Sequence, residues 1–291
     1  MSNRRCTRLG FRTVTHCSLF ALVAACTSAC TSESTTPPAG QSFYLALGDS
    51  IAFGWTPLVE DKTQTELMEG YPEKLAQELG LDLVNASCPG EATGGFISLD
   101  GVDNGCRMNR AAYPLHVAYE GAQLDFALTT LEAHPETAIV TFDLGANDLS
   151  MLNDMCAGDR LCVLTGLDAT LAAAATNLDA IFDAIRSTAG YSGPLVVLTY
   201  YALDYSDSTQ VAAFEGLNDV IVNAAEPAGA IIADGFGAFE AAASGGSSCT
   251  AGLLAPLEDG TCDPHPSVHG QEVLAGAVRA ALDGAGITFE Q

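Results

Sequence analysis

Short apolar runs alternate with longer stretches of helical periodicity over most of the chain. The apolar runs that we interpret as strands cover residues 43–47, 81–85, 138–144, 195–200 and 230–234. The stretches with the three-to-four-residue spacing of amphipathic helices cover residues 71–79, 118–133, 167–187, 209–225 and 270–282. This alternation is typical of βαβ units. We therefore predict one α/β domain, a three-layer α/β/α sandwich of flavodoxin-like type with a five-stranded, mainly parallel sheet.

The amino-terminal 25 residues have a different pattern. Four arginines lie between residues 4 and 12, and residues 19–25 are uncharged and apolar, an order that indicates a secretory signal peptide. The apolar run is too short to span a bilayer, which takes about 20 residues, so we expect no transmembrane helix in the mature protein. The segment Leu-Val-Ala-Ala-Cys at 22–26 resembles a bacterial lipobox with Cys26 as the lipidated residue. Cys30 is a second candidate, and an ordinary cleaved signal peptide is the alternative.

A segment of low complexity follows the signal. Residues 27–41 consist mainly of Ser, Thr, Pro, Gly and Ala, with a single charge at Glu33. Such a composition cannot build a hydrophobic core, so we interpret residues 26–42 as a flexible linker. The remaining residues, 43–291, are numerous enough for one α/β domain.

The chain is strongly acidic, with 36 Asp and Glu residues against 11 Lys and Arg residues. Removing the four signal arginines changes the formal net charge from −25 to −29. Such a surface repels nucleic acid and anionic lipid headgroups, since phosphate binding needs clustered cations. We therefore expect no nucleic-acid partner and interpret the charge as a solvated acidic surface. We expect a monomer.

Six cysteines remain after the signal and anchor segments: Cys88, Cys106, Cys156, Cys162, Cys249 and Cys262. An even number in an exported chain indicates disulfides. Several pairings are possible in principle, but the cysteines group along the chain in three local pairs. We predict the bonds 88–106, 156–162 and 249–262. A zinc site is the alternative, yet no pair has the two-residue spacing or the nearby histidines that zinc sites show.

Polar turns follow the first three predicted strands. These turns are Gly48-Asp49-Ser50, the segment 85–90 that ends in Cys88-Pro89-Gly90, and Gly145-Ala146-Asn147-Asp148. Because sites in parallel sheets form outside the carboxyl ends of the strands, we expect these turns to share one edge. A fourth segment, Asp263-Pro264-His265-Pro266-Ser267, precedes the final helix.

In this order, the four segments resemble the four blocks of the SGNH (GDSL) family of serine ester hydrolases, and the resemblance runs from Phe43 to the final helix. It implies that Ser50 is the nucleophile and His265 the base. It also implies an oxyanion hole built from the backbone amides of Ser50 and Gly90 and the side-chain amide of Asn147. The family needs no metal or organic cofactor and acts on small-molecule esters.

The residues themselves leave two candidates for the base. A serine hydroxyl needs a neighbouring base, usually imidazole. The histidines beyond the signal are His116, His134, His265 and His269. His116 lies in a predicted loop and His134 at a helix end, which leaves His265 and His269. The resemblance selects His265.

Asp263 is the candidate for the residue that orients the base. It lies two residues before His265 and could accept the proton on Nδ1, which would direct Nε2 toward Ser50. Many members of the family carry this acid three residues before the histidine, where this chain has Cys262. A backbone carbonyl in place of Asp263, or a capping role for Asp263 at the following helix, therefore remains an alternative.

The sequence alone does not identify the ester. We favour short-to-medium acyl chains, because no long apolar segment suggests an interfacial lid. Phe53, Trp55, Phe96 and Tyr201 are candidates for an acyl pocket, although such aromatics belong more often to the core. A lipase or phospholipase, a carbohydrate acetylesterase, and a non-catalytic surface lipoprotein that uses the same fold to bind a partner are the alternatives. We expect export, with the protein either anchored at the cell surface or extracellular or periplasmic.

Overall fold

The structure, a computed structural model, describes residues 42–289. The predicted signal peptide, Cys26 and the linker up to residue 41 lie outside these residues. The strands are β1 (Phe43–Gly48), β2 (Asp82–Asn85), β3 (Ile139–Asp143), β4 (Leu195–Leu198), β5 (Ile231–Ala233), β6 (Leu254–Pro256) and β7 (Cys262–Pro266).

The helices lie between and after these strands. The α-helices are α1 (Ser50–Phe53), α2 (Tyr71–Leu79), α3 (Thr93–Ile97), α4 (Cys106–Ala112), α5 (Gln123–Ala133), α6 (Ala146–Met155), α7 (Arg160–Asp183), α8 (Ser208–Ala225), α9 (Gly235–Ala243) and α10 (Val268–Gly284). Shorter helical turns are η1 (Thr65–Leu67), η2 (Ala184–Thr188) and η3 (Glu226–Ala228).

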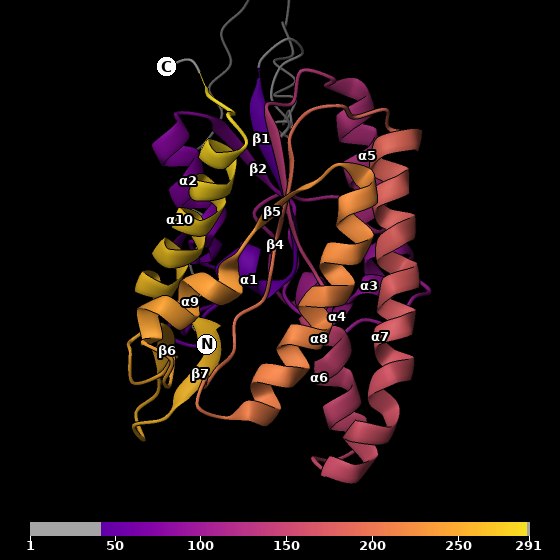
Figure 1. Cartoon of the computed structure of the whole chain (residues 1–291). Helices are drawn as coiled ribbons and strands as arrows, with labels where there is room; N and C mark the ends of the chain where they lie inside the picture. The colour runs from indigo at the N-terminus through magenta and orange to yellow at the C-terminus, as the bar shows by residue number, and fades with distance from the viewer. Residues whose placement is uncertain (1–41, 290–291) are drawn as a thin grey trace, which may run out of the picture. The chain divides into compact units, whose positions relative to one another are not determined.

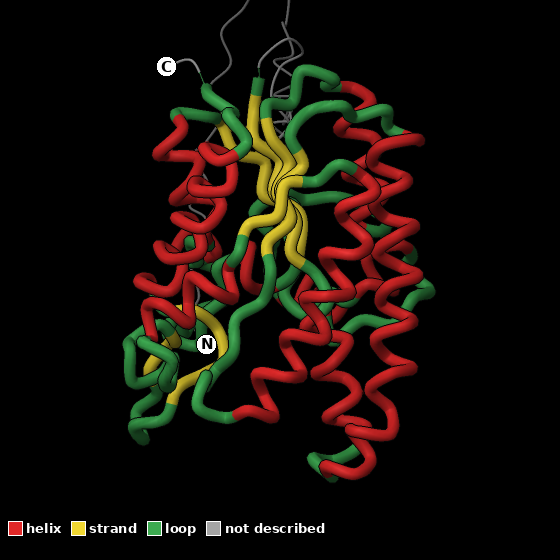
Figure 2. The backbone as a smooth tube through the Cα atoms, viewed as in Figure 1, coloured by secondary structure: helices red, strands yellow, loops and turns green. Residues whose placement is uncertain are grey.

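Five parallel strands form the middle layer in the order β2-β1-β3-β4-β5, and the strands run through the centre of Figure 2. Every residue of β1 and β3 is buried, because a parallel sheet is covered on both faces. Continuous apolar runs, and not alternating ones, are therefore the pattern that such strands need. The predicted five-stranded α/β/α sandwich is confirmed.

Helices cover both faces of the sheet. Figure 1 shows α2, α9 and α10 on one side and α5, α7 and α8 on the other. Helix α10 buries Leu274, Val278 and Leu282, which are spaced four residues apart and so lie on one face of the helix. All the long helices expected from periodicity are present, with ends displaced by a few residues, the largest displacement being the start of the α7 segment at Arg160.

Several elements were not predicted. Helix α1 has four residues, and α6 begins within the turn after β3 that was expected to be irregular. Helices α3, α4 and α9 were also missed. Residues 262–266 form β7, which pairs antiparallel with β6, although three prolines in the two strands conceal the strand pattern. His265 therefore lies on a strand, and the final helix begins after it, capped by the Ser267 hydroxyl.

The three predicted disulfides are formed in the expected pairing. Cys88–Cys106 closes the segment after β2, Cys156–Cys162 joins the end of α6 to the start of α7, and Cys249–Cys262 holds β7. Cross-links that close loops of these lengths stabilise a fold by about 2 to 3 kcal/mol each, in the chain-entropy account. They also indicate an oxidising compartment.

One described helical run, Arg160–Thr188, is long and apolar enough by composition to span a membrane, with a mean hydropathy of 1.4 over 18 residues. Leu178, Ile181 and Phe182 bury part of one of its faces in the core of the sandwich. Asp179 lies exposed on the same helix. Only 11% of this window is buried, so core packing does not account for its hydropathy, to which the four consecutive alanines at residues 172–175 contribute.

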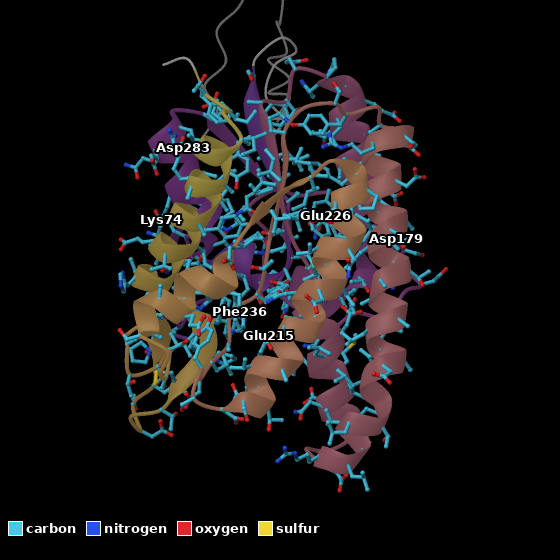
Figure 3. The ribbon with its side chains drawn as sticks, viewed as in Figure 1. Lys74, Asp179, Glu215, Glu226, Phe236 and Asp283 are labelled. Carbon is cyan, nitrogen blue, oxygen red and sulfur yellow. A yellow bond between two sulfur atoms is a disulfide. The ribbon has the colours of Figure 1, made fainter. Side chains whose placement is uncertain are left out.

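The outer surface is acidic, as the composition indicates. Asp179, Glu215, Glu226 and Asp283 project from exposed positions on the helices of both outer layers (Figure 3). Charged side chains at such positions keep the outer faces of the helices hydrated, while their apolar faces pack on the sheet.

Candidate active site

The turn between β1 and α1 places Ser50 at the carboxyl edge of the sheet. Gly48 ends β1 with a φ of +148°, and a Cβ on it would lie 2.2 Å from Asp143 Oδ1, so only glycine fits. Asp49 caps α1, since its Oδ1 accepts a hydrogen bond from Ile51 N at 2.8 Å. The chain therefore reverses sharply, and Ser50 becomes the first residue of the helix.

Ser50, His265 and Asp263 form a hydrogen-bonded line. His265 Nε2 lies 2.9 Å from Ser50 Oγ. His265 Nδ1 lies 2.5 Å from Asp263 Oδ1, which also accepts a bond from His265 N at 3.0 Å. The structure thus brings together the three residues that the sequence singled out. Ser50 and His265 are 215 positions apart along the chain. Such a line can move a proton from the serine hydroxyl to the imidazole.

The surroundings of His265 hold its ring in place. The indole of Trp55 packs on it, with 4.5 Å between ring centroids, and Lys62 Nζ lies 4.7 Å from the Trp55 ring. Tyr201 donates a hydrogen bond to the carbonyl of Pro264 at 2.8 Å, which holds β7 in place next to His265. Partial burial raises the pKa of Asp263, but the hydrogen bonds from His265 outweigh it and hold that pKa below its usual range.

The other described histidines lie away from Ser50. The Nε2 atom of His116 is 2.9 Å from the carbonyl of Phe53, and burial lowers the pKa of His116. His134 caps α5. The side chain of His269 is 60% exposed and its Nδ1 lies 3.5 Å from Glu272. Of the two candidates that the residues left open, the structure places His265 and not His269 against the serine.

Asn147 connects two of the turns at the sheet edge. Its Nδ2 donates to the carbonyl of Glu91 at 2.9 Å and to Asp49 Oδ2 at 3.2 Å. The segment after β2 is therefore joined to the β1–α1 turn through Asn147. Both N–H groups of the Asn147 side chain thus donate within the protein. An oxyanion bound at Asn147 would replace the longer of the two contacts, the one to Asp49.

Gly90 lies in the same segment, with a φ of +83°. A Cβ on Gly90 would lie 2.5 Å from the carbonyl oxygen of Asn104. The Asn104 backbone donates to the Gly90 carbonyl at 2.8 Å, and its side-chain Nδ2 donates to Asn147 Oδ1 at 2.8 Å. Asn104 thus orients Asn147 and holds the Gly90 loop. Asn104 was not predicted from the sequence, where its position two residues before Cys106 is the one feature that points to this loop.

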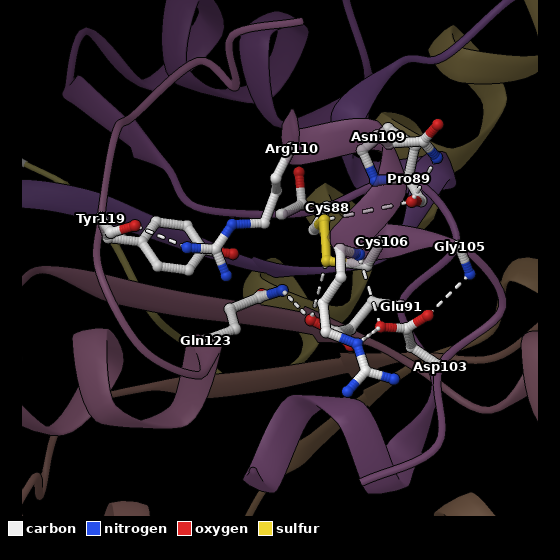
Figure 4. The surroundings of a disulfide bond; sticks show 12 residues. Cys88, Pro89, Glu91, Asp103, Gly105, Cys106, Asn109, Arg110, Tyr119 and Gln123 are labelled. Atoms are coloured by element: carbon white, nitrogen blue, oxygen red, sulfur yellow. Dashed lines mark hydrogen bonds and ion pairs between the residues drawn. A yellow bond between two sulfur atoms is a disulfide. The ribbon is translucent and has the colours of Figure 1, made fainter. Parts of the chain in front are cut away.

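The Cys88–Cys106 disulfide closes the segment that contains Gly90 (Figure 4). Beside it lies the buried carboxyl of Glu91, whose pKa is raised to about 8 by burial and by repulsion from Asp103. Cys88, Glu91 and Cys106 are the one metal-like grouping among the described residues. Both sulfurs are in the disulfide, so no thiolate is available to a metal ion.

Asp148, the last residue of the predicted turn after β3, joins α6 to α3. Its carboxyl accepts bonds from Thr93 N at 3.1 Å and Thr93 Oγ1 at 2.6 Å. Thr93 also accepts a bond from Asn177 of α7 at 2.9 Å. These contacts fix the start of α6, and with it Asn147.

A cavity of about 710 Å³ opens at Ser50 and His265, within the range of small-molecule sites. Its wall is formed largely by apolar and aromatic side chains of α6, α7, α8 and the segment after β4: Ala146, Leu149, Val163, Tyr200, Tyr201, Leu203, Ala213 and Phe214. Among the four aromatic candidates, Tyr201 lines this cavity. Phe53 and Phe96 are instead fully buried in the core, and Trp55 packs on His265.

The model of the GDSL-like lipase/acylhydrolase family matches residues 46–273 of the chain. A search of curated proteins found no match. Among solved structures, an extracellular lipase from Streptomyces rimosus is 20% identical, with a TM-score of 0.56 over 82% of this chain and 99% of that one. LAE5, an α/β hydrolase from the metagenome of Lake Arreo, is 20% identical, with a TM-score of 0.53 over 84% and 96%.

The acetylxylan esterase Axe2 from Geobacillus stearothermophilus is 18% identical, with a TM-score of 0.52 over 87% of this chain and 97% of that one. At these identities the likeness to solved structures shows the fold alone.

Replacing Asn104 by Ala should lower kcat by about tenfold with little change in KM, because the Asn147 amide loses the bond that orients it. Ester hydrolysis measured at several substrate concentrations checks this. Thr137→Val removes a buried side-chain bond to the carbonyl of His134, before the start of β3 and away from Ser50, and serves as the control. Equal rates for Asn104→Ala and the control would show that Asn104 does not orient the site.

Proposed function

The chain belongs to the GDSL-like lipase/acylhydrolase family, and we propose that it is an exported esterase that cleaves carboxylic esters of short to medium acyl chains by way of an acyl-enzyme at Ser50. The observation that carries the proposal is the hydrogen-bonded line from Asp263 through His265 to Ser50. It ends at the mouth of an apolar cavity.

In the proposed reaction, Ser50 Oγ attacks the ester carbonyl while His265 Nε2 accepts its proton. Asp263 holds the Nδ1 proton and stabilises the imidazolium. The negative oxygen of the tetrahedral intermediate accepts hydrogen bonds from the backbone amides of Ser50 and Gly90 and from Asn147 Nδ2, donors worth about 3 kcal/mol each in comparable sites. The alcohol leaves with the proton from His265. Water then attacks the acyl-enzyme by the reverse sequence, with His265 again as the base.

The dimensions of the cavity support a short-to-medium acyl chain. The lining residues of α6 extend from Ala146 to Asn153, a distance of about 10 Å along the helix axis. An extended chain of about eight carbons has that length, since each C–C bond of about 1.5 Å advances it by about 1.25 Å. Arg160 and Thr209, joined by a hydrogen bond of 2.9 Å, form a polar far end.

One observation favours a second candidate function, the hydrolysis of aggregated lipid esters. Met155, Leu161 and Leu164 are 77%, 71% and 53% exposed where α6 meets α7, beside the cavity residues Arg160 and Val163. These three side chains are not the long apolar segment of an interfacial lid, but they form a smaller apolar surface beside the cavity. Such side chains are suited to contact with a neutral or zwitterionic lipid surface.

We also propose that residues 1–25 direct export, that Cys26 is lipidated and that residues 26–42 tether the domain. The disulfides support an oxidising destination. In a bacterial host, the full-length chain should partition into the detergent phase, whereas Cys26→Ser should remain in the aqueous phase. Recovery of both proteins from the aqueous phase would contradict the anchor.

Replacing Ser50 by Ala should reduce ester hydrolysis to the background rate while the circular dichroism spectrum and the unfolding temperature stay close to those of the parent. A serine-directed fluorophosphonate should label the parent stoichiometrically, at a site that peptide mapping assigns to Ser50. Labelling of a different residue, or full activity of the Ser50→Ala variant, would exclude Ser50 as the nucleophile. No labelling and no hydrolysis would favour the non-catalytic binding module.

A panel of 4-nitrophenyl esters should give a maximum of kcat/KM at about six to ten acyl carbons, the reach of the cavity. The same enzyme is then assayed on emulsified triglyceride, on phospholipid vesicles and on acetylated oligosaccharides. Replacing Leu161 and Leu164 by Ser tests the lipid alternative. A selective loss of emulsion activity would support it, and a maximum at acetyl esters would count against the medium-chain preference.

A further inference from the structure

Two buried carboxyl groups lie beneath the nucleophile. Asp49 and Asp143 are each 1% exposed, one in the turn after β1 and the other at the end of β3. The sheet register pairs Gly48 with Asp143. Because Gly48 has no side chain, the Asp143 carboxyl occupies the space beside it, in direct interaction with Asp49.

The two carboxyl groups differ in how they are satisfied. Asp49 accepts hydrogen bonds from the Ile51 amide at 2.8 Å, the Tyr200 hydroxyl at 2.6 Å and Asn147 Nδ2 at 3.2 Å. Asp143 Oδ1 accepts one from the Tyr71 hydroxyl at 3.1 Å. Asp143 Oδ2 is buried and receives no hydrogen bond from any described N–H or O–H group. The donors therefore favour a negative charge on Asp49 and not on Asp143.

We propose that Asp143 is a positioning residue that remains protonated and donates its proton to the Asp49 carboxylate, which fixes Asp49 and, through it, the Asn147 amide. The proton gives Asp143 Oδ2 a partner and adds a fourth donor to Asp49. The catalytic consequence, though not the protonation itself, rests on the proposed role of Asn147 in the oxyanion hole.

The electrostatics of the pair agree with this assignment. Burial, followed by repulsion from Asp49, raises the pKa of Asp143 well above its usual range. Burial raises the pKa of Asp49 as well, opposed by its hydrogen bonds to Ile51 and Tyr200. Two adjacent carboxyls in a dry site cannot both ionise without a large cost, so they retain one shared proton.

The titratable groups that face the pair add no second negative charge in the ordinary pH range. They are four tyrosines whose own pKa values burial raises, and the base itself: Tyr44, Tyr71, Tyr200, Tyr201 and His265. The Ala52 backbone amide also lowers the pKa of Asp143, as does Tyr71, but burial and the repulsion from Asp49 prevail.

The Asp143 proton affects catalysis because the negative charge of the Asp49–Asp143 pair lies next to Ser50 and Asn147. Asp49 adjoins Ser50 and holds one N–H of Asn147, the same donor that the oxyanion needs. If Asp143 ionised, the pair would carry two negative charges beside the developing oxyanion, and the transition state would be destabilised. A single shared proton keeps the negative charge of the pair at one.

Infrared spectroscopy of the whole enzyme labelled with ¹³C-aspartate tests the protonation directly. The parent should show the C=O stretching band of a protonated aspartic acid at neutral pH, and Asp143→Asn should lack it. This measurement does not depend on ester hydrolysis, so it separates a failure of this inference from a failure of the proposed function. Identical spectra for the parent and the variant would overturn the inference.

Kinetics test the consequence. Asp143→Asn retains a donor toward Asp49 and should keep kcat within about threefold of the parent, whereas Asp143→Val should lower kcat at least about tenfold with KM nearly unchanged. Thr141→Val is the control and should be near the parent. It removes a buried polar contact between Thr141, on β3 like Asp143, and Tyr44 on β1. Both Asp143 variants are accepted for kinetics only with a native circular dichroism spectrum.

The pH profile gives a second reading. Because the pKa of Asp143 is raised, its proton is lost as the pH rises, so the parent should lose activity on the alkaline side and Asp143→Asn should not. If Asp143→Val fails to fold, the infrared band and the comparison of the parent with Asp143→Asn still test whether Asp143 is protonated and positions Asp49. Equal alkaline losses, or a tenfold lower kcat for Asp143→Asn, would overturn the positioning role.

Discussion

The carboxylate of Asp49 is the point on which the site depends. It lies in a sharp turn between β1 and α1, fully buried, and it receives hydrogen bonds from the helix that carries Ser50, from Tyr200 after β4 and from Asn147 on α6. A buried charge is tolerated only when its hydrogen-bonding capacity is filled. Three separate segments of the chain must therefore meet at this residue, and their meeting sets the position of Ser50 relative to Asn147.

Several features restrict the conformation of the chain around Asp49. Gly48 leaves room for the carboxyl of Asp143, and Gly90 leaves room for the backbone of Asn104. The Cys88–Cys106 bond closes the Gly90 loop, while the antiparallel pairing of β6 with β7 carries His265 to the serine from the other end of the chain. Each of these features restricts the motion of a segment that carries a site residue. The hydrogen-bond donors of the site are therefore held in position before a substrate binds.

The sequence predicted the sheet and the long helices because periodicity and buried apolar runs are properties of neighbouring residues. It also placed Ser50, Gly90 and Asn147 at the sheet edge, since parallel strands share their carboxyl ends. It did not predict Asn104 or the buried pair of Asp49 with Asp143, because these contacts join residues far apart in the chain. The β6–β7 hairpin was missed because prolines and a disulfide, and not strand periodicity, shape it.

These contacts support our proposal that Ser50, Gly90 and Asn147 form a preorganised oxyanion hole above this buried charge. The most direct measurement is a crystal structure of the enzyme covalently inhibited by an alkyl phosphonate. In that structure, a phosphonyl oxygen should lie about 2.7 to 3.1 Å from the amides of Ser50 and Gly90 and from Asn147 Nδ2, with the alkyl chain along α6. A phosphonyl oxygen that faces solvent, or an adduct on another residue, would contradict it.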